Sequence, residues 1–184
     1  MKNFFILSGE SLLETPKIID FETLYDRYVK HLSFPHCDYV VFLEEKKLYL
    51  FVECTRYLER ATNRERFVPK PVFIDETIRQ KEIKEIVKKA LGSLIVAGIC
   101  KDETLGCVFA KGYKRIFVLM ASIDKTYVRD GRLSPTALRV WDSMLKTISE
   151  YISPFYLPVD GRVVVFVPLI DDMSCETKIY EMIK

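Results

Sequence analysis

Two apolar segments on either side of a short polar turn constrain the fold of this chain more than any other feature of its sequence. Residues 38–43 and 48–55 are strand-length and apolar at nearly every position, and the segment 44–47 between them reads EEKK. Two such runs around a short polar segment indicate a β-hairpin. Strands that are apolar on both sides belong to a sheet that is covered on both faces, as in α/β proteins.

Helical periodicity accounts for much of the remaining chain. Apolar residues recur every three to four positions after three candidate helix caps, Asp20, Asp75 and Ser134. The expected helices span 21–32, 76–98, 135–152 and 171–183, and the other strands span 116–121 and 162–167, with weaker strand patterns at 4–7 and 106–110. The segment 56–74 reads as an irregular arm. This order of elements predicts an α/β fold with a mixed central sheet flanked by helices.

The bulk properties of the chain indicate one ordinary globular domain. The 184 residues contain no linker, repeat or low-complexity tract, so we expect a single domain over 1–184. Apolar residues make up 49% of the chain and charged residues 29%, which excludes a disordered protein. The net charge of +2 is too small to indicate nucleic acid or a membrane by itself.

Several features together predict a cytoplasmic protein. The longest apolar stretches are too short to span a membrane, and the apolar run at 4–7 is too short for an export signal. The five cysteines are an odd number and form no CxxC pair, which argues against a secreted disulfide framework.

One Gln and two Asn in the whole chain, beside many Lys and Glu, are typical of hyperthermophiles.

The predicted hairpin brings two carboxylates together. If its turn is symmetric, Leu43 pairs with Leu48, and Asp38 then lies opposite Glu53. Directly opposed residues point to the same face of a sheet, with Cβ atoms about 4.5–5.5 Å apart. Two carboxylates this close in an apolar setting repel each other, and a divalent cation offsets the repulsion. Because Mg²⁺ prefers oxygen ligands, the pair predicts a divalent-metal site.

A plainer interpretation of the same acids stays open. In this interpretation Asp38 only ends a loop, and the carboxylate of Glu53 pairs with a nearby arginine, either Arg56 or Arg60. Such an ion pair would satisfy Glu53 without any metal.

The residues beside the two acids have other potential roles. The same register sets Cys37 opposite Cys54, on the face away from the acids, either as a disulfide or as two packed thiols. It also sets His36 opposite Thr55, where the imidazole is either a proton carrier for the site or a surface hydrogen-bonding group. His31, His36, Cys37 and Cys54 are types of residue that bind zinc, but their spacing matches no familiar zinc site.

With Asp38 entering the hairpin and the segment 51–55 (FVECT) leaving it, the chain resembles the PD-(D/E)XK nuclease superfamily. This superfamily includes restriction endonucleases and archaeal Holliday-junction resolvases. Its pattern is an Asp on one strand, followed by an apolar strand that ends in Glu-x-Lys. The resemblance covers about residues 20–121 and implies a restriction endonuclease-like fold.

The resemblance also implies a set of metal ligands. Asp38 and Glu53 would hold Mg²⁺ or Mn²⁺, and the main-chain carbonyl of Cys54 would be a further ligand. An acid of the first helix, Glu22 or Asp26, would assist them.

One position departs from the pattern of the superfamily. Thr55 stands where its members have the lysine that orients the attacking water and neutralises charge in the transition state. Some members supply this lysine from the following helix, and Lys81 and Lys84 are the candidates here, with Lys70 behind them. If none of them reaches the site, the protein is a weakened or inactive relative.

A basic arm follows the second acid and is the predicted nucleic-acid-binding segment. Its cations are Arg56, Arg60, Arg64, Arg66 and Lys70, with Tyr57 and Phe67 between them. Each cation that meets a phosphate adds salt-dependent affinity. The alternative is an ordinary solvated arm, because Glu59 and Glu65 dilute its charge.

Together these features predict a divalent-metal-dependent DNA phosphodiesterase, a nuclease that binds Mg²⁺ or Mn²⁺. A duplex substrate has two strands to cut, which favours a homodimer. Two alternatives remain: a catalytically degenerate protein of the same fold that binds nucleic acid, and an assembly protein whose acids are paired with arginine.

Overall fold

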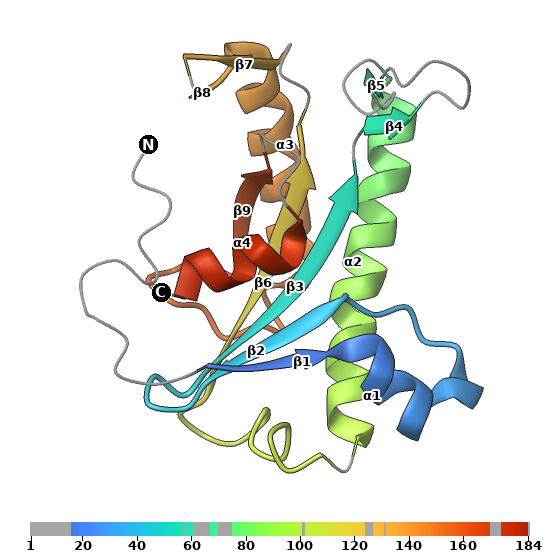
Figure 1. Cartoon of the computed structure of the whole chain (residues 1–184), viewed down its shortest axis with the longest axis vertical. Coiled ribbons are helices and arrows are strands. Elements are labelled where there is room, and N and C mark those ends of the chain that lie inside the picture. The colour runs from blue at the N-terminus through green and yellow to red at the C-terminus, as the bar shows by residue number, and fades with distance from the viewer. Residues whose placement is uncertain are drawn as a thin grey trace.

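The centre of the molecule is a five-stranded mixed sheet, seen in the computed structural model of Figure 1. The structure describes residues 16–56, 58–60, 67–69, 75–100, 102–123, 127–130, 132–169 and 174–183. The strands of the sheet, in spatial order, are β1 (Lys17–Asp20), β2 (Tyr39–Leu43), β3 (Leu48–Arg56), β6 (Lys114–Ser122) and β9 (Val164–Leu169). Strand β2 pairs antiparallel with both β1 and β3, while β6 pairs parallel with both β3 and β9. The predicted α/β class with a mixed central sheet is therefore confirmed.

The predicted register of the hairpin is also confirmed over the length of β2. Leu43 pairs with Leu48, and the ladder continues in this register to Tyr39 and Val52. The turn is closed by a hydrogen bond of 3.0 Å from the Lys47 N–H to the Glu44 carbonyl, and Lys47 has a positive φ of 48°. A four-residue turn therefore preserves the alternation of side chains that the sequence predicted.

Helices cover both faces of this sheet (Figure 1). They are α1 (Phe21–Tyr28), a 3₁₀ turn η1 (Lys30–Leu32), α2 (Glu76–Ile99), α3 (Pro135–Ile152) and α4 (Cys175–Ile183). Asp20, Asp75 and Ser134 each accept a main-chain N–H in the first turn of their helix, as their positions predicted. The first helix is shorter than expected, because its α-helical part ends at Tyr28.

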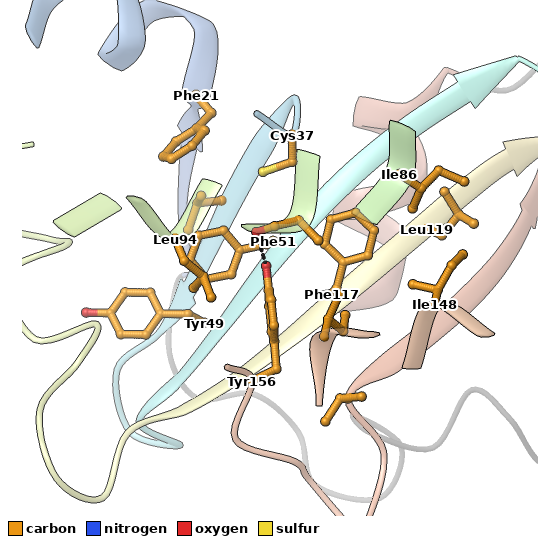
Figure 2. Close-up of a cluster of buried hydrophobic side chains, with 14 of the residues drawn as sticks. Phe21, Cys37, Tyr49, Phe51, Ile86, Leu94, Phe117, Leu119, Ile148 and Tyr156 are labelled. Carbon is orange, nitrogen blue, oxygen red and sulfur yellow. Dashed lines mark hydrogen bonds between the residues drawn. The ribbon is translucent and has the colours of Figure 1, made fainter. Parts of the chain in front are cut away.

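The alternation of side chains along β3 assigns residues to two cores. Tyr49 and Phe51 belong to the core shared with α2 and α3, and Leu50 and Val52 belong to the core on the other face, where Ile179 of α4 lies. Figure 2 shows the first of these cores, where aromatic side chains of the sheet pack against aliphatic side chains of α2 and α3. By the same alternation Glu53 faces α2, which places a buried charged residue on this side of the sheet.

Some predicted elements differ in the structure. The segment 106–110 forms successive turns instead of a strand, because Leu105 and Val108 are both buried three residues apart and are linked by a Val108 N–H to Leu105 carbonyl bond. Strand β1 was not predicted, and the predicted strand at 4–7 lies outside the described residues. The expected arm contains a short hairpin, β4 (Leu58–Arg60) with β5 (Phe67–Pro69), and a second short hairpin joins β7 (Val128–Arg129) to β8 (Arg132–Leu133).

In the part of the chain that the structure describes, no helix combines the length and the apolar character needed to cross a bilayer.

Candidate functional site

Asp38 is held in place at the point where β2 begins. Its main-chain N–H donates to the Val52 carbonyl (3.0 Å), its carbonyl accepts from the Phe21 N–H (2.9 Å), and its carboxylate Oδ2 accepts from the Cys54 N–H (2.7 Å). The regular ladder stops at the pair of Tyr39 and Val52. The expectation that Asp38 faces Glu53 as a regular cross-strand pair is therefore wrong. The Asp38 carboxylate instead bonds to the main chain of β3 at Cys54, the residue after Glu53.

Glu53 is the buried acid of the site. The residue is only 4% exposed, and its carboxylate Oε1 accepts a hydrogen bond of 2.6 Å from the ammonium of Lys89 on α2. Its second oxygen, Oε2, is buried and has no hydrogen-bond partner among the described residues. A buried carboxylate oxygen without a partner is costly. This orphan oxygen indicates that, among the described residues, the Glu53 carboxylate lacks a second partner.

The charges of the site do not balance when both acids are ionised. Asp38 and Glu53 then carry two negative charges against the single positive charge of Lys89. Burial, and then repulsion from Asp38, raise the pKa of Glu53 to about 7, although Lys89 works in the opposite direction. Burial lowers the pKa of the Lys89 ammonium, but the charge and hydrogen bond of Glu53 outweigh burial and leave that pKa raised. The site therefore favours one more positive charge, either a proton or a cation.

The main-chain carbonyl of Cys54 lies on the Asp38 side of β3. The N–H and C=O of one strand residue point toward the same neighbouring strand. Because the Cys54 N–H points to Asp38, the Cys54 carbonyl points to the same side of β3. The ligand that the resemblance implied at Cys54 thus lies on the side of the strand where Asp38 is.

The structure brings a lysine to the acids, but not one of those proposed from the sequence. Lys81 and Lys84 are exposed, and they precede Lys89 on α2 by eight and five residues, which is about 12 and 7.5 Å along a helix axis. Thr55 is half-buried on β3 and pairs with Ala121 of β6. Among the described residues, the ammonium group in contact with the site belongs to Lys89.

The spacing of buried residues along α2 is a sequence pattern that indicates Lys89. Side chains three and four apart lie on the same face of a helix. Lys89 follows the buried Ile86 by three residues and precedes the buried Ser93 by four. This spacing places it at the border of the apolar stripe of α2, where a long side chain reaches the sheet.

Of the two acids of α1, Glu22 has His36 as a partner. The carboxylate of Glu22 lies 3.4 Å from Nε2 of His36, and Nδ1 of His36 lies 3.0 Å from the Cys37 carbonyl. Asp26 is exposed on α1. Within the ranges that the structure describes, His, Cys, Asp and Glu side chains nowhere gather in a group of three or more suited to a metal. An ion at this site would therefore rely on Asp38, Glu53 and main-chain or solvent oxygens.

The cysteines are arranged differently from the prediction. Cys37 is buried on the same face as Glu53, among core side chains such as Phe51 (Figure 2), and burial raises the pKa of its thiol. Cys54 is on the opposite face and forms a disulfide with Cys175 of α4. The expectation that Cys37 and Cys54 oppose each other fails because the regular register ends at Tyr39, before it reaches Cys37.

Most of the predicted basic arm is not described. Arg64, Arg66 and Lys70 lie outside the described residues, and the side chains of Arg56 and Arg60, at the ends of β3 and β4, are likewise not described. On α2, the half-buried Arg79 pairs with Glu76, and the exposed Lys88 pairs with Glu85.

No protein-family model, no curated protein and no solved structure matches this chain. The function is therefore inferred from the site itself, which combines two carboxylates and an ammonium group.

Proposed function

We propose that this chain is a divalent-metal-dependent DNA phosphodiesterase with a restriction endonuclease-like fold. The observation that carries the proposal is the orphan Oε2 of Glu53, buried beside a second carboxylate and left with excess negative charge. Burying an unpaired carboxylate oxygen and excess negative charge is unfavourable if the acids only form an ion pair with Lys89. The same arrangement favours the binding of a cation.

The residues present are suited to a hard divalent ion. Asp38, Glu53 and the Cys54 carbonyl supply only oxygen donors, which Mg²⁺ and Mn²⁺ prefer. These two acids and the carbonyl would hold the ion. When bound, the ion supplies a Lewis acid and lowers the pKa of a coordinated water.

Lys89 replaces the lysine that the superfamily pattern has at position 55. Its raised pKa keeps the side chain protonated at neutral pH, so it serves as a charge and a hydrogen-bond donor and not as a general base. An ammonium group fixed beside the acids favours the additional negative charge that develops on a phosphate during hydrolysis. Lys89 therefore orients the attacking water and stabilises the phosphate oxygens.

DNA is the proposed substrate because the site is followed in the sequence by the cations that are predicted to contact the phosphates of its backbone. Arg56 is the last residue of β3, the strand that carries Glu53, and Arg60 is the last residue of β4. On α2, Lys81 and Lys84 are exposed between Lys89 and the start of the helix. Phosphate contacts of this kind position a nucleic acid without reading its sequence.

The proposal is tested by cleavage of supercoiled plasmid and branched DNA with Mg²⁺ or Mn²⁺. We expect cleavage that a chelator stops and that Glu53→Gln abolishes, because the amide cannot supply the negative charge that holds the ion. Glu85→Gln is the matched control, since Glu85 is an exposed acid of α2 that pairs with Lys88. Cleavage that persists in Glu53→Gln would contradict the proposal.

One observation favours a second candidate, a DNA-binding protein of the same fold that has lost catalysis. Lys89 already pairs with Glu53 at 2.6 Å, which reduces the need for a metal. This candidate predicts retention of DNA that a chelator does not affect, with no cleavage. An assembly protein would show no affinity for DNA at low salt.

The stability of the metal-free protein should fall as the pH rises. Glu53 has a pKa of about 7 in the folded protein, above its ordinary value, so the folded state binds its proton more tightly than the unfolded state does. Stability from this proton is fully present below pH 4.5 and is lost as the pH rises through about 7, by on the order of 3 kcal/mol in total. Urea unfolding in chelator at pH 5 and pH 8 measures the change.

The variant Glu53→Gln removes this titrating group and should lose that part of the pH dependence. Glu85→Gln should keep it, because Glu85 is exposed. Equal pH dependence in wild type and Glu53→Gln would mean that the burial of Glu53 has no energetic consequence.

A further inference from the structure

Helix α2 makes a close main-chain contact with the segment that leads to Asp38. Gly92 is buried, and a Cβ atom added to it would lie 1.9 Å from the carbonyl oxygen of Pro35 and 3.1 Å from its carbonyl carbon. Main-chain atoms cannot move aside as the end of a flexible side chain can. Only glycine at position 92 therefore allows this approach of helix and segment.

The next residue of α2 fixes the same segment by hydrogen bonds. Ser93 is fully buried, and its hydroxyl accepts a bond of 2.8 Å from the Cys37 N–H. The same hydroxyl donates a bond of 2.7 Å to the carbonyl of Lys89. One side chain thus links the residue before Asp38 to the residue that carries the ammonium group of the site.

These contacts bear on the geometry of the site. Lys89 lies one helical turn before Ser93, and Asp38 is adjacent to Cys37. The position of the ammonium group relative to the Asp38 carboxylate is consequently set by how α2 meets the segment at Gly92 and Ser93. Sites of this kind work only when neighbouring residues hold the reacting groups to within a fraction of an ångström.

We propose that Gly92 and Ser93 are positioning residues, which hold Asp38 and Lys89 in the arrangement that binds the metal and the phosphate. The inference rests on the proposed function and extends it to residues that touch neither metal nor substrate. The Gly92 and Ser93 contacts are the clamp between α2 and the start of β2.

The first test compares Ser93→Ala with Ser93→Thr and Ala97→Gly in the full chain. Alanine removes the hydroxyl, whereas threonine keeps it. Ala97 is a buried residue of α2 one turn further on, so Ala97→Gly weakens the same helix without touching the clamp. Thermal unfolding checks that each variant is folded, and Mn²⁺ binding is measured by electron paramagnetic resonance.

We expect Ser93→Ala to weaken Mn²⁺ binding about 10- to 100-fold, the usual effect of removing a group that orients a ligand. Ser93→Thr should keep most of the wild-type affinity. Ala97→Gly should leave the affinity unchanged even if its unfolding temperature falls as much as that of Ser93→Ala. Amide exchange should quicken at Cys37 and Asp38 in Ser93→Ala but not in Ala97→Gly. A loss of Mn²⁺ affinity that merely follows the loss of stability in all variants would overturn the positioning role.

A second variant tests the close contact. Gly92→Ala should displace α2 and raise both the Mn²⁺ concentration needed for half-maximal cleavage and the amide exchange of the segment 36–38. Unchanged exchange and unchanged Mn²⁺ dependence in Gly92→Ala would overturn the role of Gly92. If the unmodified protein does not bind Mn²⁺, the proposed function is wrong, and this extension is wrong with it. If the unmodified protein binds Mn²⁺ and Ser93→Ala binds it equally well, only the positioning role is wrong.

Discussion

Replacing Lys89 by methionine is expected to lower the rate of DNA cleavage at least about 100-fold and, at the same time, to strengthen Mn²⁺ binding. Methionine keeps most of the length of the side chain but removes the ammonium that bonds to Glu53. Without that positive charge, the two carboxylates attract a cation more strongly. The phosphate, however, loses the group that would stabilise its charge. Cleavage kinetics and Mn²⁺ titration, made on the same preparation, measure both effects.

The neighbouring lysine supplies the control for this experiment. Lys88 is exposed and pairs with Glu85 at 2.8 Å, so Lys88→Met removes a charge from the same turn of α2 without touching the site. We expect its cleavage rate and Mn²⁺ affinity to stay close to those of the wild type. A Lys89→Met variant that cleaves DNA at the wild-type rate would show that the ion pair with Glu53 is only structural.

Asp38→Asn is expected to abolish Mn²⁺ binding and cleavage while making the metal-free protein more stable. The amide oxygen can still accept the Cys54 N–H, so the local fold is kept. The variant loses the charge that repels Glu53 and raises its pKa, and a gain of about 1 kcal/mol at pH 8 is therefore expected. Such opposite effects on stability and function are typical of residues selected for a site.

Urea unfolding in chelator and Mn²⁺ titration check the two halves of this prediction. Asp75→Asn is a suitable control, because Asp75 is an exposed acid that caps α2 and asparagine caps helices equally well. It should change neither Mn²⁺ affinity nor cleavage. An Asp38→Asn variant that is less stable than the wild type at pH 8, and that still binds Mn²⁺, would contradict the charge balance inferred for the site.

The local elements of this fold could be predicted from the sequence because their causes are local. The register from Leu43–Leu48 to Tyr39–Val52 follows from the turn length and the two-residue period of a strand. The helix starts follow from side chains that accept main-chain N–H groups one turn ahead. Neither inference requires knowledge of how distant segments pack.

The geometry of the site could be predicted only in part, because tertiary contacts decide it. Asp38 leaves the ladder because its main chain is held by α1 and β3, and Cys37 before it is held by Ser93. Lys89 meets Glu53 across 36 positions of sequence, and this depends on where α2 crosses the sheet. The two acids were visible in the sequence, but the lysine that completes them was not identified.

Anomalous scattering from crystals of the protein grown with Mn²⁺ is the most direct measurement of whether Asp38 and Glu53 share a cation. We expect one peak in contact with both carboxylates and with the Cys54 carbonyl, and the Lys89 ammonium moved away from Glu53 Oε1. If Glu53 instead keeps its bond to Lys89 in saturating Mn²⁺, and no peak lies beside Asp38, the acids do not form a metal site and the nuclease proposal is wrong.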